Sequence, residues 1–163
     1  MENEILQIAN EVVELLSKNN LTITTAESCT GGMIGAALTE IAGVSSYYKE
    51  GIITYSNEAK MKYLKVKEET LKKFGAVSED TAIQMALGAM QNADSDISVA
   101  VTGIAGPDGG TKEKPNGLVY ICVKNGNNYT VEKNIFSGNR HSVRVQTVVK
   151  ALNMVKNTIN SWF

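Results

Sequence analysis

The stretch ITTAESCTGGM, residues 23–33, decides how the rest of the chain is organised. An apolar and β-branched run over 21–25 is typical of a short buried strand, and residues 33–38 favour a helix. The octapeptide 25–32 is therefore predicted to turn from strand to helix. Such a turn directs the first backbone N–H groups of the helix, and the positive end of its dipole, toward the strand end.

The predicted turn carries the hydroxyl groups of Ser28 and Thr30. Backbone donors stabilise an oxyanion without reorganising, so this position suits a nucleophile beside an oxyanion hole. Serine and threonine also cap helices very commonly. On the octapeptide alone, a helix cap is the better interpretation.

The composition fits one globular domain over residues 1–163, with 43% hydrophobic and 20% charged residues. A net charge of −1 gives no electrostatic reason to expect nucleic acid or an anionic membrane as a partner. Cys29 and Cys122 form no C-x-x-C pair, so neither a disulfide framework nor a zinc site is predicted. The acidic start and the lack of a long apolar run lead us to expect a cytoplasmic protein.

Helix and strand patterns alternate along most of the chain, which predicts a three-layer α/β/α sandwich. We expect a mixed, mainly parallel sheet closed by a C-terminal β-hairpin with an Asn-Gly turn. Helices are predicted over 3–18, from 33 to near Gly43, and over 58–63, 69–74, 78–92 and 140–161. Further strands are predicted over 51–55, 97–102, 117–123 and 128–135.

A serine nucleophile needs a base, and the chain offers two candidates. His141 has no acidic partner nearby in sequence, so a Ser-His-Asp triad is unsupported. Lys60 lies in the first turn of the predicted helix 58–63, where positive potential lowers the pKa of an amine. Tyr55, at the end of the preceding strand, would orient or relay the proton. Spacing alone still favours a solvated Lys60 and a core Tyr55.

The loop 103–110 holds four glycines, which let a backbone approach a ligand closely. It follows a buried strand and lies at the same sheet edge as Ser28 if both strands are parallel, although a plain tight connection would also use glycine and proline. Arg140 and Arg144 are one helical turn apart and repel weakly unless an anion lies between them. The alternative is two ordinary surface arginines.

Five segments, 25–32, 55–60, 75–78, 102–110 and 136–140, together resemble the CinA C-terminal domain family and span nearly the whole chain. The resemblance implies hydrolysis of the carboxamide of nicotinamide mononucleotide to nicotinate mononucleotide and ammonia, in pyridine nucleotide salvage. It implies serine–lysine catalysis without a metal or a cofactor. It also implies a homodimer with a small-molecule nucleotide as substrate.

In this scheme Lys60 takes the proton of Ser28 with the help of Tyr55, and N–H groups at the start of the helix after Thr30 bind the oxyanion. Cys29 is the rival nucleophile, because thiolates are intrinsically better nucleophiles. The loop 103–106 and one of the two arginines would hold ribose and phosphate. The residues expected to bind substrate are Glu27, Cys29, Thr30, Gly31, Gly32, Asn57, Thr102, Gly103, Ala105, Gly106, Arg140 and Arg144.

Two other classes of function stay open on the sequence. The same glycines and arginines suit a non-catalytic nucleotide-binding or regulatory module. The exposed pair Trp162-Phe163 suits a structural dimerisation domain.

Overall fold

The computed structural model describes residues 2–163, whose helices and strands alternate as the sequence predicts. In chain order the elements are α1 (Glu2–Asn19), β1 (Ile23–Glu27), α2 (Met33–Thr39), the 3-10 turn η1 (Val44–Ser46), β2 (Tyr48–Ile53), α3 (Asn57–Leu64), α4 (Glu68–Phe74), α5 (Glu79–Ala93), β3 (Ile97–Gly103), β4 (Leu118–Asn125), β5 (Asn128–Ile135) and α6 (Arg140–Trp162).

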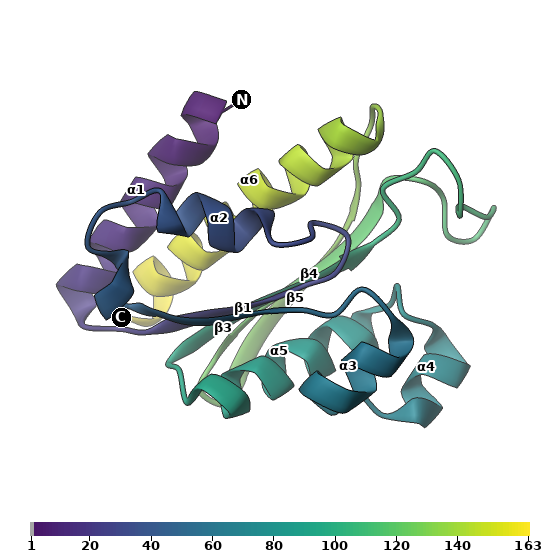
Figure 1. Ribbon diagram of the computed structural model, residues 1–163, viewed down its shortest axis with the longest axis horizontal. Helices are drawn as coiled ribbons and strands as arrows, with labels where there is room; N and C mark the ends of the chain where they lie inside the picture. Colours follow the sequence, from purple (N-terminus) through teal and green to yellow (C-terminus); the bar gives the residue numbers. More distant parts are fainter. Residues whose placement is uncertain (1) are drawn as a thin grey trace.

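The strands form one five-stranded mixed sheet in the order β2-β1-β3-β4-β5. β1 runs parallel to both β2 and β3, whereas β4 is antiparallel to β3 and to β5. Helices α1, α2 and α6 cover one face, and α3, α4 and α5 cover the other (Figure 1). The three-layer α/β/α class is confirmed, but the sheet is open, with β2 and β5 at its edges.

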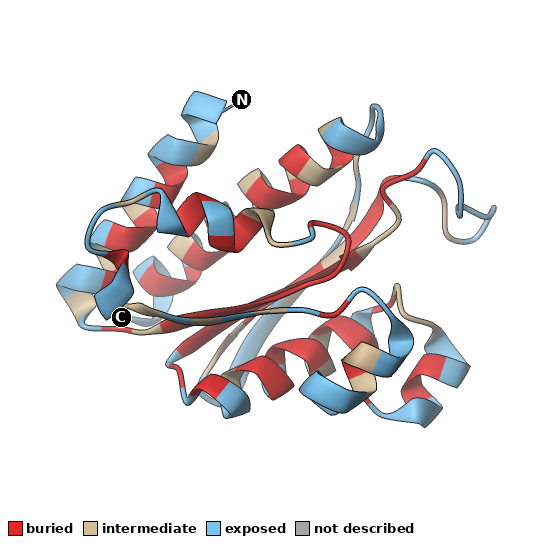
Figure 2. Cartoon of the chain, in the orientation of Figure 1, coloured by how far each residue is buried: buried red, intermediate tan, exposed pale blue. Residues whose placement is uncertain are grey.

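Apolar side chains form a core on each side of the sheet. The larger cluster joins α1, α2 and α6 to the inner strands, and the smaller one joins α5 and α3 to the opposite face. Every residue of β1 is buried, and buried residues run along the centre of the molecule (Figure 2). The C-terminal end of β1 therefore lies between the two helical layers and is shielded from solvent.

Several element boundaries differ from the predicted ones. β1 spans Ile23–Glu27, two residues later than the predicted strand over 21–25, so the turn to α2 starts after Glu27. α2 ends at Thr39, four residues before Gly43, and Gly43 instead begins η1 at φ 84°. β2 starts at Tyr48 because its pairing with β1 begins there, and it ends before Tyr55. The β4–β5 turn shortens to two residues, since β4 continues to Asn125. No described helix is long and apolar enough to cross a membrane.

Candidate active site

A cavity of about 260 Å³ lies where β1 and β3 end, bordered by the chain that follows each strand and by the start of α3 and α6. This is the sheet edge predicted from the parallel order of the two strands. The cavity brings together most of the predicted site residues: Ser28, Cys29, Tyr55, Asn57, Lys60, Thr102, Gly103, Ala105, Gly106 and Arg140. His141 lies apart from it, in a groove beside α1.

Ser28 and Lys60 are in direct contact at the base of this cavity. The Lys60 Nζ atom lies 2.9 Å from Ser28 Oγ and 2.7 Å from the carbonyl oxygen of Thr54. Both side chains are buried, with Ser28 8% exposed and Lys60 2% exposed. Burial lowers the pKa of the Lys60 amine from its ordinary 10.5 to about 8, so a useful fraction is neutral near physiological pH.

Two local features place Lys60 there. Ser56 caps α3, accepting a hydrogen bond from the Ala59 backbone at 3.0 Å, so the helix starts just beyond β2. At its other end α3 rests against α5, where a Cβ on Gly88 would overlap the carbonyl oxygen of Leu64. Glycine therefore permits the close packing that holds Lys60 against the end of β1.

The start of α2 is occupied by the Glu27 carboxylate, which is 1% exposed. This carboxylate accepts hydrogen bonds from the backbone of Gly32 and Ile34, both at 3.1 Å, and from Gly35 at 2.9 Å. It also accepts a hydrogen bond from the Thr30 hydroxyl at 2.6 Å. The predicted oxyanion hole at the start of this helix is therefore wrong, because an internal anion already satisfies those donors.

The same contacts change the interpretation of the octapeptide. We expected Glu27, Thr30, Gly31 and Gly32 to touch substrate, but none of them lines the cavity. They build the turn instead: Gly31 and Gly32 have φ values of 58° and 102°, which favour glycine. The turn is a support for Ser28.

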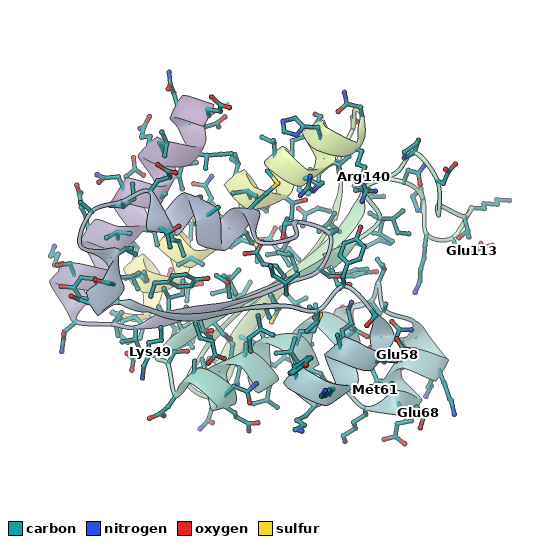
Figure 3. The ribbon with its side chains drawn as sticks, viewed as in Figure 1. Lys49, Glu58, Met61, Glu68, Glu113 and Arg140 are labelled. Atoms are coloured by element: carbon teal, nitrogen blue, oxygen red, sulfur yellow. The ribbon has the colours of Figure 1, made fainter. Side chains whose placement is uncertain are left out.

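The two arginines of α6 have different partners. Arg144 donates from Nε to the carbonyl of Cys29 and from Nη2 to that of Thr30, both at 3.0 Å. Arg140 reaches from the start of α6 toward the loop after β3 and donates to the Gly106 carbonyl at 2.9 Å (Figure 3). Only Arg140 lines the cavity, and Arg144, expected to contact substrate, instead anchors the turn that carries Ser28.

Tyr55 lies at the cavity rim and is 63% exposed. Its hydroxyl accepts a hydrogen bond from Arg140 Nη2 at 2.8 Å. Within residues 2–163 it makes no hydrogen bond to Ser28 or Lys60. The predicted proton relay through Tyr55 therefore has no supporting contact in this structure. Tyr55 follows β2 instead of ending it, which carries the ring outward.

Cys29 lines the cavity beside Ser28, but its thiol is a poor rival nucleophile. Burial raises the pKa of this thiol from 9.0 to about 11. The group therefore stays protonated near neutral pH, and the thiol form is weakly nucleophilic.

Other backbone donors remain for an oxyanion. The N–H groups of Cys29, Ala105 and Gly106 belong to cavity-lining residues and donate to no backbone carbonyl within the described chain. Two different loops carry them, one after β1 and one after β3. These N–H groups are therefore candidate donors to an oxyanion in the cavity.

Five lining residues were not among the predicted site residues: Ala76, Val77, Ile104, Asp108 and Gly109. All of them fall in the segments 75–78 and 102–110, two of the five segments that resemble the family. The sequence therefore indicated these segments but not the individual residues. The Thr102 hydroxyl donates to the Ala76 carbonyl at 2.8 Å and joins the two segments. This contact between the two segments decides which of their residues face the cavity. Local sequence patterns do not encode such a contact.

The protein is an open α/β sheet with a buried serine–lysine pair at the end of a central strand, an arrangement that suits serine-based nucleophilic chemistry. The model of the CinA C-terminal domain matches residues 5–159, and the chain belongs to that family. A CinA-like protein of Kosmotoga olearia is 52% identical over 148 residues, which make up 91% of this chain and 36% of that protein. The chain spans about a third of the length of several curated relatives that it matches.

One relative of similar length has a more specific name. The nicotinamide-nucleotide amidohydrolase PncC of Escherichia coli K12 is 43% identical over 152 residues, 93% of this chain and 92% of that protein. The crystal structure of the competence/damage inducible protein CihA from Agrobacterium tumefaciens matches with a TM-score of 0.93 at 45% identity, covering 96% of each chain. The protein ComA of Klebsiella pneumoniae matches with a TM-score of 0.95 at 34% identity, covering 98% of this chain and 99% of that one.

Proposed function

We propose that this chain hydrolyses the carboxamide of nicotinamide mononucleotide, releasing ammonia and nicotinate mononucleotide, as a step of pyridine nucleotide salvage. The observation that carries the proposal is the 2.9 Å contact between the buried Lys60 Nζ and Ser28 Oγ at the base of the cavity. The resemblance in sequence and length to the Escherichia coli amidohydrolase supports the choice of substrate. A lysine with a pKa near 8 supports its use as a base.

In the acylation step, neutral Lys60 accepts the proton of Ser28 as Oγ attacks the amide carbon. The tetrahedral oxyanion is stabilised by backbone N–H groups of the lining loops, with Cys29 and Ala105 as donors. The Lys60 ammonium then returns its proton to the amide nitrogen. The carbon–nitrogen bond breaks, ammonia leaves, and Ser28 carries a nicotinoyl ester of the nucleotide.

In the second step, water replaces ammonia at the same position. Lys60, neutral again, takes a proton from the water as its oxygen attacks the ester carbon. Collapse of this intermediate returns the proton to Ser28 and releases nicotinate mononucleotide. Thr54 supports both steps, because its carbonyl oxygen holds the amine 2.7 Å away and leaves the nitrogen lone pair free for Ser28.

Arg140 is the residue we assign to the phosphate. It lines the cavity rim, and the hydrogen bonds to Gly106 and Tyr55 use two of its donor nitrogens. A guanidinium has five N–H donors, so others remain for an anion. The amide end of the substrate would then lie at the buried pair and the phosphate end at the mouth.

The test is ammonia release from nicotinamide mononucleotide, compared with free nicotinamide. We expect turnover of the nucleotide only, and none in Ser28→Ala, which should still bind it. Ser45→Ala, a change at an exposed serine in η1, is the matched control and should keep full activity. Full activity of Ser28→Ala would end the nucleophile assignment. A wild-type chain that binds the nucleotide and releases no ammonia would be a binding module.

A further inference from the structure

Asp108 is the one acidic residue among the described residues that line the cavity. It lies on the exposed part of the loop after β3. Within residues 2–163 its carboxylate takes part in none of the ion pairs and none of the hydrogen bonds. Its negative charge is therefore unpaired in the same cavity that Arg140 enters.

The backbone before Asp108 is held at two points. Arg140 donates to the Gly106 carbonyl at 2.9 Å, and the side-chain amide of Asn116 donates to the Pro107 carbonyl. After Asp108, a Cβ on Gly110 would overlap the Asn116 side chain, so the loop packs closely there as well. The carboxylate is thus presented from an anchored loop, which reduces the ordering that binding would require.

An ionised carboxylate accepts hydrogen bonds and donates none. In the cavity that Arg140 also lines, this carboxylate repels a bare phosphate, so it favours a ligand that presents donors next to its anionic group. Neighbouring sugar hydroxyls are such donors, and an acidic side chain bonding a ribose hydroxyl is a common solution in nucleotide sites. Asp108 and Arg140 together therefore suit a ribose and its phosphate.

We propose that Asp108 binds the ribose diol of the substrate and makes this cavity selective for ribonucleotides. The inference rests on the proposed function and deepens it. Asp108 acts in binding, since the reacting amide lies at Ser28, so its loss should raise KM and leave kcat nearly unchanged.

The experiment measures binding by calorimetry in the inactive Ser28→Ala background, with nicotinamide mononucleotide and its 2′-deoxy analogue. One hydrogen bond to a charged group corresponds to roughly tenfold to hundredfold in affinity. We expect at least about a tenfold preference for the ribonucleotide. Adding Asp108→Ala should bring this ratio close to one, mainly by weakening the ribonucleotide.

Glu113→Gln is the matched control, because Glu113 lies on the same connection but at its outer end, away from the cavity (Figure 3). It should leave the ratio unchanged, and a thermal melt should show both loop variants folded. Equal binding of the two nucleotides by the background protein would overturn the proposal. So would an equal loss of both on Asp108→Ala, which indicates an interaction with the ring or the phosphate.

A second pair of ligands tests the role of Asp108 independently of amide hydrolysis. Ribose 5-phosphate and 2-deoxyribose 5-phosphate carry the sugar and phosphate without the ring. A preference for the first that depends on Asp108 would support the diol site even if no ammonia were released. Ammonia release without any such preference would leave the proposed function standing and contradict the role of Asp108.

Discussion

Lys60 shows how a single residue acquires its chemistry from its surroundings. Its amine is buried at 2% exposure, and the loss of hydration lowers its pKa to about 8. About a tenth of the amine is then neutral at pH 7, against far less for a solvated lysine. Only the enzyme molecules whose Lys60 is neutral can carry out the reaction that we propose, so their fraction limits its rate.

The pH profile should follow this titration. The active form lacks the proton, so kcat/KM for nicotinamide mononucleotide should rise about tenfold per unit below pH 8 and level off above it. Initial rates from pH 5.5 to 9.5 in buffers of constant ionic strength measure this. A flat profile between pH 6 and 9 would contradict Lys60 as the base.

Cys29 provides the complementary case at the residue scale. Because burial holds the pKa of its thiol at about 11, Cys29→Ala should keep kcat/KM within about threefold of wild type. The backbone N–H of residue 29 is unchanged by this substitution. Loss of activity in Cys29→Ala comparable to the loss in Ser28→Ala would reverse the assignment of the nucleophile.

At the scale of elements, the turn from β1 to α2 is held from both sides. The Glu27 carboxylate binds the start of α2, and Arg144 of α6 binds the carbonyl oxygens of Cys29 and Thr30. The helix dipole is thus directed at an internal acid and not at a ligand. The turn has the geometry of an anion site, and the chain fills that site itself.

Glu27→Ala should therefore be strongly destabilising. It leaves three backbone N–H groups and the Thr30 hydroxyl without their buried acceptor, and we expect a loss of about 3 to 5 kcal/mol in unfolding free energy. Urea unfolding measures this. Glu27→Gln, which keeps an acceptor oxygen, should lose less, and Glu40→Ala at the exposed end of α2 should change little. Equal stability of Glu27→Ala and Glu40→Ala would refute this account.

At the scale of the whole molecule, the site is assembled from both helical layers. α3 brings Lys60 from one face of the sheet, and α6 brings Arg140 and Arg144 from the other (Figure 1). The partners are distant in sequence: Lys60 and Ser28 are 32 residues apart, and Arg144 and Cys29 are 115 apart. Folding of the complete sheet is therefore a condition for the site.

A buried amine also affects global stability. The folded pKa of Lys60, about 8, lies below its ordinary 10.5, so between these values the unfolded chain binds more protons and stability rises with pH. Relative to Lys60→Met, the wild-type unfolding free energy should gain about 2 to 3 kcal/mol from pH 7.5 to 10.5. Urea titrations at both pH values test this. Comparison with Lys60→Met removes the titration of groups that do not interact with Lys60, and a constant difference would contradict a buried, ionisable Lys60.

Much of the architecture was predictable from local patterns. The apolar run that predicts β1 and the Asn-Gly signal that predicts the hairpin both depend on neighbouring residues, and each led to an element that the structure contains. The predicted start of β2 was wrong because pairing with β1 sets it, and the predicted end of α2 was wrong because Gly43 starts the next turn instead of ending the helix.

The sequence by itself determined the order of the elements, the sheet edge where Ser28 lies and the residue types available there, because short-range propensity and periodicity encode these. Tertiary structure alone decided that Glu27 fills the start of α2, that Arg144 is an anchor and that Tyr55 bonds Arg140 and not Ser28. It also decided that Lys60 is buried. These outcomes depend on contacts between distant segments and on exclusion of water, which exist only once both helical layers have packed on the sheet.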